Sequence, residues 1–152
     1  MKPGLPLDPL SVPLTGRRLI EASAGTGKTW TIAMLFLRLI VEAGWPIESI
    51  LVVTFTRAAT AELSRRLRER LQQALAVLDR MERWPDERIR DELGLAGDPL
   101  VDWARGLEHP VGARRRIAGA LHHMDGAAVT TIHGFCARML QAFAFELSLI
   151  HI

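Results

Sequence analysis

A run of small residues followed by a lysine and a threonine stands near the start of the chain. Its members, with the spacing A-x4-G-K-T, are Ala22, Ser23, Ala24, Gly25, Thr26, Gly27, Lys28 and Thr29. Small side chains let successive backbone N–H groups curl around a phosphate, and a helix that begins there adds the positive end of its dipole. Lys28 would reach the β- and γ-phosphates and the Thr29 hydroxyl would bind Mg²⁺. The pattern predicts a nucleotide-binding phosphate loop over residues 22–29.

The flanking residues supply the context that such a loop requires. Arg18–Ala22 is short and mostly apolar, as expected of a strand, and a helical pattern begins at Lys28 and ends before Gly44. Ile50–Phe55 is continuously apolar and rich in β-branched residues, which predicts a strand buried on both faces. Strand, helix and strand in this order form a βαβ unit, so we expect a parallel sheet flanked by helices.

The rest of the chain divides into further elements. The prolines of residues 1–16 predict an extended lead-in. The later elements are predicted as a long amphipathic helix over Arg57–Leu78, short helical pieces within 79–111 that pack through Trp103, a helix over Arg114–Met124, a strand over Ala127–Ile132 and a helix over Phe135–Glu146. The sequence therefore predicts one α/β domain.

Composition limits the class of protein. The 152 residues are 49% hydrophobic and 24% charged, which is typical of a globular domain. No apolar run approaches the roughly 20 residues of a membrane span, and the start lacks the features of a signal peptide. The single cysteine, Cys136, fits a reducing compartment, so we expect a cytoplasmic protein with no membrane partner.

Charge alone does not identify a partner. The net charge is +2, and the excess of arginine over glutamate within Arg57–Arg70 is most simply a solvated helix face.

Three segments together resemble the UvrD/Rep-like superfamily 1 DNA helicases, and most closely their RecB-type branch. Arg18–Ile40 is similar to the first ATPase motif of the family with its strand and helix, and Ile50–Leu71, with TFTRAATAEL, is similar to motif Ia. Ala128–Leu140, with TTIHGFC, resembles the family's T-[IF]-H-[GS]-F-C segment. The order and spacing of the three segments also match.

The resemblance implies a P-loop NTPase with a RecA-like motor domain, incomplete here, that uses ATP and Mg²⁺. Residues 17–147 would form the N-terminal part of that domain, and residues 148–152 match nothing in the family. Carried over by position, the residues at the DNA channel would be Thr54, Phe55, Thr56, Thr131 and His133. Hydroxyl and imidazole groups can bind phosphates, and an aromatic ring can stack on any base. Phe55 and Phe135 remain open between core and stacking roles.

The implied function is that of an ATP-dependent helicase and exonuclease subunit acting on double-strand DNA ends in recombinational repair. Its partners would be single- and double-stranded DNA ends and RecC-like and RecD-like subunits. The alternatives are a UvrD-like or AddA-like helicase without a RecB-type nuclease, and a nucleotide-binding module that hydrolyses nothing.

Two departures from the family pattern matter. Thr15 stands where the family usually has a glutamine that binds adenine, and a hydroxyl cannot present the paired donor and acceptor of an amide. No acidic pair follows an apolar strand to hold Mg²⁺ and position water. We therefore expect this chain to be a truncated N-terminal piece that is inactive by itself.

Overall fold

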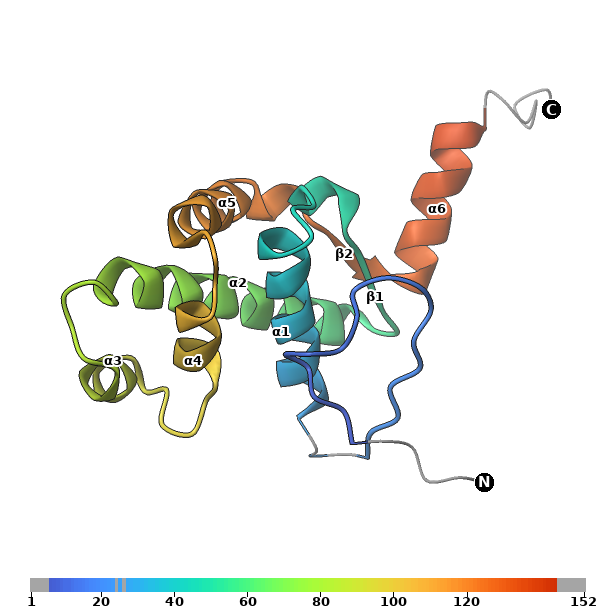
Figure 1. The fold of residues 1–152 in the computed structure, drawn as a ribbon. Helices are drawn as coiled ribbons and strands as arrows, with labels where there is room; N and C mark the ends of the chain where they lie inside the picture. The colour runs from blue at the N-terminus through green and yellow to red at the C-terminus, as the bar shows by residue number, and fades with distance from the viewer. Residues whose placement is uncertain (1–5, 24, 26, 145–152) are drawn as a thin grey trace.

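The long helix α2 (Arg57–Arg80) lies at the centre of the fold (Figure 1). The structure is a computed structural model that describes residues 6–23, 25 and 27–144. Apolar residues recur every three or four positions along α2 and form one buried stripe, which contains Leu63, Leu67, Leu71, Ala74 and Leu78. This stripe lies where four other helices contact α2.

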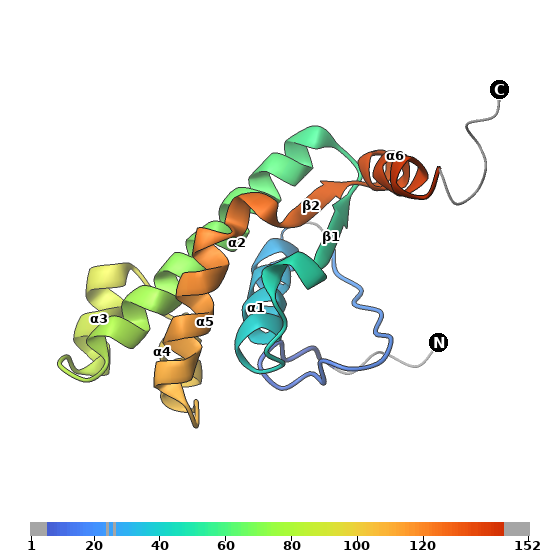
Figure 2. The ribbon, with the colours of Figure 1, turned by 90° about the horizontal axis from the view of Figure 1, so that it is seen from above.

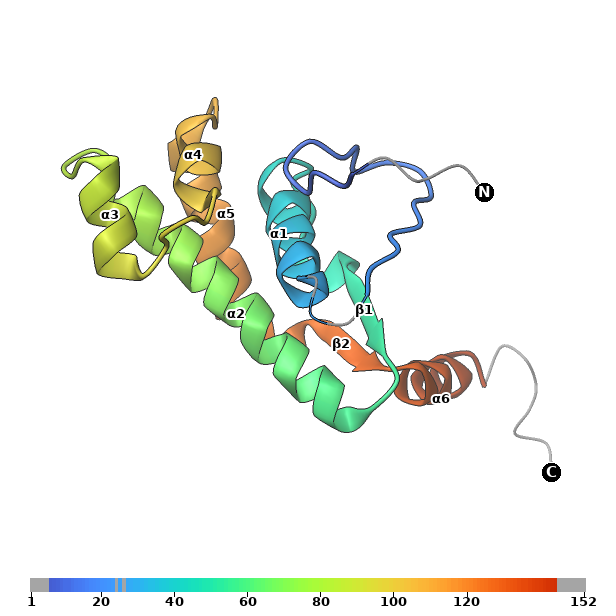
Figure 3. The ribbon, with the colours of Figure 1, turned by 90° about the horizontal axis from the view of Figure 1, so that it is seen from below.

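Two helices cover that stripe. α1 (Lys28–Val41) and α5 (Pro110–His122) both lie against α2 and also against each other. Met34 and Leu37 from α1 and Ile117 from α5 are fully buried. Figures 2 and 3 show α3 (Asp86–Leu93) and α4 (Leu100–Arg105) near the end of α2 that is farther from the strands. The core is therefore mainly helical.

A two-stranded parallel sheet lies beside these helices. β1 (Leu51–Thr54) pairs with β2 (Ala128–Thr131) in register, from Leu51 opposite Ala128 to Thr54 opposite Thr131. Short 3-10 turns at Ile47–Ser49 and Met124–Gly126 precede the two strands. α6 (Ile132–Phe143) follows β2 directly and projects away from the other helices (Figures 1 and 2). The strands end at one edge, as parallel pairing requires.

The helices and the last strand confirm the sequence predictions, but the first strand does not form. Residues 18–22 have no regular structure, and Leu19 is 85% exposed. A strand needs a neighbour to satisfy its backbone N–H and C=O groups, and within the described part of the chain β1 and β2 pair only with each other. The expectation that β1 is buried on both faces is also wrong, because Leu51 and Val53 are exposed.

The lead-in contains a turn that is fixed to α1. Asp8 accepts hydrogen bonds from the Leu10 N–H at 3.0 Å and the Ser11 hydroxyl at 2.7 Å. The buried Arg38 donates from Nη1 to the carbonyls of Pro9 at 2.7 Å and Val12 at 2.9 Å. Arg38 therefore holds the segment before the predicted phosphate loop against α1.

Arg70 is not on a solvated face, in contrast to the expectation for the α2 arginines. It is 6% exposed, and its Nη2 donates to Asp98 at 2.9 Å. The same carboxylate oxygen accepts the Trp30 indole N–H at 3.1 Å, and the guanidinium lies 5.4 Å from the Trp30 ring centroid. Burial raises the pKa of Asp98, but the hydrogen bonds from Arg70 and Trp30 outweigh it, so the net pKa shift is downward.

We predict that Asp98→Asn lowers the free energy of unfolding by about 3 kcal/mol, because it leaves the buried Arg70 charge uncompensated. Since folding lowers the pKa of Asp98, its stabilisation is complete above the ordinary value of 3.8 and disappears as the pH falls through the folded-state pKa. Urea unfolding at pH 7 and pH 3 measures both effects.

The control is Asp125→Asn, which removes the partner of Arg68 at a side chain that is 97% exposed. An exposed pair contributes about 0–1 kcal/mol. Equal losses in the two variants at pH 7 would show that the Arg70 pair has no special role.

Candidate nucleotide site and strand-edge groove

Two glycines of the predicted phosphate loop have a left-handed backbone conformation. Gly25 and Gly27 have φ angles of 77° and 79°, a left-handed region that side chains with a Cβ rarely adopt. Gly27 is the N-cap of α1 and has no side chain with which to cap that helix end. The first turn also carries no acidic residue. Ala24 and Thr26, two other predicted members of the loop, lie outside the described residues.

Lys28 lies exposed at the start of α1 and makes no ion pair with any residue that the structure describes. A hollow of about 400 Å³ lies beside it, lined by Ala22, Ser23 and Lys28, by the acidic Glu21, and by apolar side chains including Ile20. A lysine without a local partner can bind an external anion at no cost in broken ion pairs. Exposed N–H groups at a helix start beside an accessible lysine are the features of a phosphate site, so the described part of the loop remains a candidate for one.

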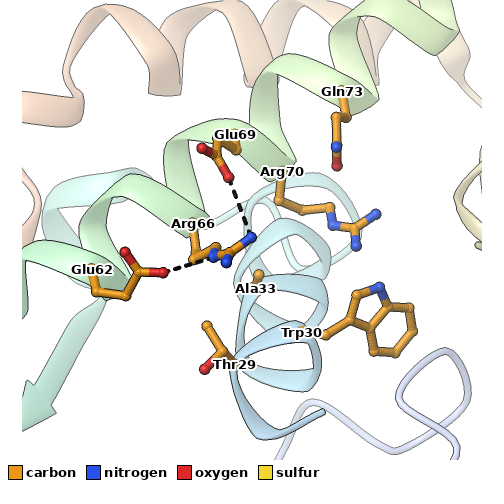
Figure 4. A pocket seen from close by; sticks show the side chains of 8 residues that line it. All are labelled: Thr29, Trp30, Ala33, Glu62, Arg66, Glu69, Arg70 and Gln73. Atoms are coloured by element: carbon orange, nitrogen blue, oxygen red, sulfur yellow. Dashed lines mark hydrogen bonds and ion pairs between the residues drawn. The ribbon is translucent and has the colours of Figure 1, made fainter. Parts of the chain in front are cut away.

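Thr29 lies on the opposite flank of the same helix end. It lines a separate pocket of about 260 Å³ between α1 and α2 (Figure 4). Its exposed hydroxyl is the group predicted to bind Mg²⁺. The described residues contain no cluster of three or more His, Cys, Asp or Glu side chains that could hold a metal by themselves. Two carboxylates, Glu62 and Glu69, line the same pocket as Thr29, and both are paired with arginines of α2.

A groove of about 690 Å³ lies at the edge where both strands end. The structure brings together Phe55 from the end of β1 and Thr131 and His133 from the end of β2, with Arg57 on the same wall. Phe55 is 86% exposed, so it is not a core residue, whereas Phe135 is half-buried. Three of the five predicted DNA-channel residues thus share one groove.

The threonines at this edge have structural roles that the sequence analysis missed. Thr56 caps α2 by accepting the Ala59 N–H at 3.1 Å, and Thr131 caps α6 by accepting the Gly134 N–H at 3.0 Å. Thr54 shares a 2.6 Å hydrogen bond with Thr60. A threonine directly before a helical pattern is a recognised N-cap signal and could have revealed both caps. A capping hydroxyl still keeps its own hydrogen for donation.

Two of the exposed α2 arginines, Arg65 and Arg66, are occupied locally. Arg65 and Arg66 form ion pairs with Glu62 and Glu69 along the helix. The hydrogen bonds from these arginines hold the pKa of Glu62 below its ordinary value. These charges compensate one another, so this face of α2 is not an unopposed basic surface.

Three further observations place the chain among known proteins. A family model described as the UvrD/REP helicase N-terminal domain matches residues 8–151. The chain is 47% identical over 150 residues to the RecBCD enzyme subunit RecB of Escherichia coli K12, covering 92% of this chain and 12% of that protein. It is 44% identical over 151 residues to the RecB subunit of Haemophilus influenzae, covering 93% and 12%. The chain thus spans about an eighth of these relatives' length.

No helix in the described residues has the length and apolar character of a membrane span.

We predict that Gly134→Ala destabilises the junction of β2 and α6. A Cβ there would lie 2.7 Å from the Thr130 Oγ1 and 3.2 Å from the Thr131 Oγ1, so the buried Thr130 side chain must move and the capping Thr131 hydroxyl must shift slightly. Overpacking of this kind costs about 1–3 kcal/mol. The matched control is Gly119→Ala in α5, where a Cβ meets nothing within 4 Å and helix propensity should stabilise by about 0.5–1 kcal/mol. Urea unfolding should give opposite signs, and a gain in both variants would contradict the packing.

Proposed function

We propose, because the chain belongs to the UvrD/REP helicase family, that it is the ATP-binding N-terminal part of a RecB-type DNA helicase subunit. The observation that carries the proposal is the start of α1. Two left-handed glycines, one of them the N-cap of α1, and Lys28, which forms no ion pair with a described residue, meet there within the segment that the family match covers. A nucleoside triphosphate with bound Mg²⁺ is a ligand that suits these backbone and lysine groups.

In this proposal each group of the loop has a separate task. The N–H groups at the start of α1 would bind phosphate oxygens, and Lys28 would neutralise charge on the β- and γ-phosphates. Thr29 would hold Mg²⁺ through its hydroxyl. Bound ATP supplies the free energy that drives movement along DNA. Neither β1 nor β2 is followed by a carboxylate, so the acids that hydrolysis needs would come from residues beyond those described.

The strand-edge groove is the proposed contact with single-stranded DNA. Phe55 offers an exposed face on which a base can stack without sequence preference, and His133 and Arg57 can bind phosphates. Thr56 and Thr131 would contribute through the hydrogens of their capping hydroxyls. The relatives' names describe subunits of the RecBCD enzyme, so we further propose RecC-like and RecD-like partners and a role at DNA ends in repair. We place this activity in the cytoplasm.

We predict that Lys28→Ala in the intact protein weakens ATP binding at least tenfold, because a charge-assisted contact to phosphate contributes about 1.5–3 kcal/mol. Isothermal titration calorimetry with ATP in the presence of Mg²⁺ measures the change in the ATP dissociation constant. Arg115→Ala, which removes the same charge from an exposed site on α5, should leave the affinity unchanged. Wild-type affinity in the Lys28 variant would refute the nucleotide site.

We predict that Phe55→Ala weakens binding of single-stranded DNA by about 1–3 kcal/mol, the usual contribution of a stacked base. His133→Ala should weaken it further, and ATP affinity should stay near the wild-type value in both variants. Arg65→Ala is the control, because that arginine is already paired with Glu62 and Glu69.

Fluorescence anisotropy with labelled oligothymidylate at low and moderate salt separates the two kinds of contact. Stacking should survive moderate salt, whereas a diffuse charge effect should fade. If Arg65→Ala abolished DNA binding while Phe55→Ala left it intact, the groove would not be the contact.

A further inference from the structure

One side chain ties the first turn of α1 to other parts of the protein. Lys28 and Thr29 are exposed, and the buried residues of α1 begin at Ala33. Within residues 28–31, Trp30 is the residue whose side chain forms a hydrogen bond with another described segment. The orientation of this turn relative to α2 therefore depends on the contacts of Trp30, because the buried packing of α1 begins a turn later.

Trp30 is held in two directions. Its indole N–H donates to Asp98 Oδ2 at 3.1 Å. The Arg70 guanidinium lies over the indole, 5.4 Å from the ring centroid (Figure 4). The hydrogen bond constrains the edge of the ring and the cation–π contact constrains its face. Hydrophobic burial is non-directional, so these two contacts restrict rotation of the first turn more closely than burial does.

Asp98 is itself fixed by groups outside α1. Its Oδ1 accepts the Leu100 N–H at 2.9 Å, and its Oδ2 accepts Arg70 Nη2 at 2.9 Å in addition to the indole. Its side chain is 16% exposed, and the Arg70 charge balances its own. Each carboxylate oxygen thus has a donor that does not belong to α1, which makes Asp98 a fixed anchor for Trp30.

Thr29 directly precedes Trp30 in the helix. Consecutive residues of an α-helix are about 100° apart around its axis, so a rotation that moves the indole also moves the Thr29 hydroxyl. Mg²⁺ requires near-octahedral geometry with ligand oxygens at about 2.0–2.1 Å. A lysine that reaches a phosphate through its flexible chain tolerates a larger displacement. Loss of the Trp30 contacts would therefore affect the proposed metal ligand before the phosphate contact of Lys28.

We propose that Trp30, Asp98 and Arg70 are positioning residues for Thr29, which hold its hydroxyl where it can bind the Mg²⁺ that accompanies a nucleoside triphosphate. The inference rests on the proposed function, since Thr29 must first be the metal ligand. The three residues act through the first turn of α1 and not by contact with the nucleotide. Phosphate binding by Lys28 and the loop backbone does not depend on them.

The test measures the increase in ATP affinity that Mg²⁺ causes, by isothermal titration calorimetry of the intact protein in Mg²⁺ and in EDTA. Trp30→Phe keeps an apolar ring but removes the indole N–H that Asp98 accepts. It should weaken ATP binding in Mg²⁺ about two- to tenfold, the range for one hydrogen bond, and leave the affinity in EDTA unchanged.

Trp103→Phe is the matched control. The Trp103 indole N–H donates to Glu42 Oε1 at 2.8 Å, at the opposite end of α1. Urea unfolding should show a lower midpoint for both variants, because each loses a hydrogen bond between an indole and a carboxylate. Only Trp30→Phe should reduce the effect of Mg²⁺ on ATP affinity. An equal reduction in both variants would show that the Trp30 contact is merely structural and would overturn the proposal.

A double-mutant cycle with Thr29→Val tests whether Trp30 acts through Thr29, because valine keeps the shape of the side chain and lacks the hydroxyl. Thr29→Val should reduce the effect of Mg²⁺, and adding Trp30→Phe should reduce it no further. Losses that add would overturn the proposal, since Trp30 would then act independently of Thr29.

Urea unfolding first establishes that each variant is folded. Asp98→Asn, whose single acceptor oxygen cannot serve both Leu100 and Trp30, carries the test if Trp30→Phe is not. Lys28-dependent ATP binding with the same Mg²⁺ effect in wild type and Trp30→Phe would overturn this proposal and leave the nucleotide site intact. A wild-type protein that binds no ATP would overturn the proposed function as well.

Discussion

The buried contact of Arg70 with Asp98 and Trp30 fixes the geometry on which the candidate nucleotide site depends. Arg70 is on α2, Trp30 is in the first turn of α1, and Asp98 precedes α4, so one guanidinium joins three segments that are distant in sequence. Asp98 also accepts the Leu100 N–H at 2.9 Å. Because Trp30 follows Thr29 directly, this contact sets where the start of α1 lies relative to α2.

The parallel register of the two strands imposes the second constraint. Since Thr54 lies opposite Thr131, the residues that follow each strand emerge at one edge, and each chain segment then turns into a helix capped by a threonine. The caps fix the directions in which α2 and α6 leave the sheet. The proposed DNA groove and the proposed nucleotide site are therefore built from different helix ends, α2 and α6 for one and α1 for the other.

The sequence predicted the elements whose pattern is local. The apolar period of α2 and the β-branched run of β1 are visible within a few neighbouring residues, and both elements form. The strand expected over Arg18–Ala22 does not, because a strand depends on a partner that its own residues cannot specify. Arg70 was grouped with the solvated arginines, since nothing near it in sequence shows that Asp98 and Trp30 will bury it. Both caps were missed although the threonines stand where capping residues are expected.

The most direct test of the account is a crystal structure of the intact protein with Mg²⁺ and a non-hydrolysable ATP analogue. We predict phosphates against the backbone at the start of α1 beside Lys28, and Mg²⁺ on the Thr29 hydroxyl. A nucleotide whose phosphates lay away from Lys28 would contradict the proposed nucleotide site.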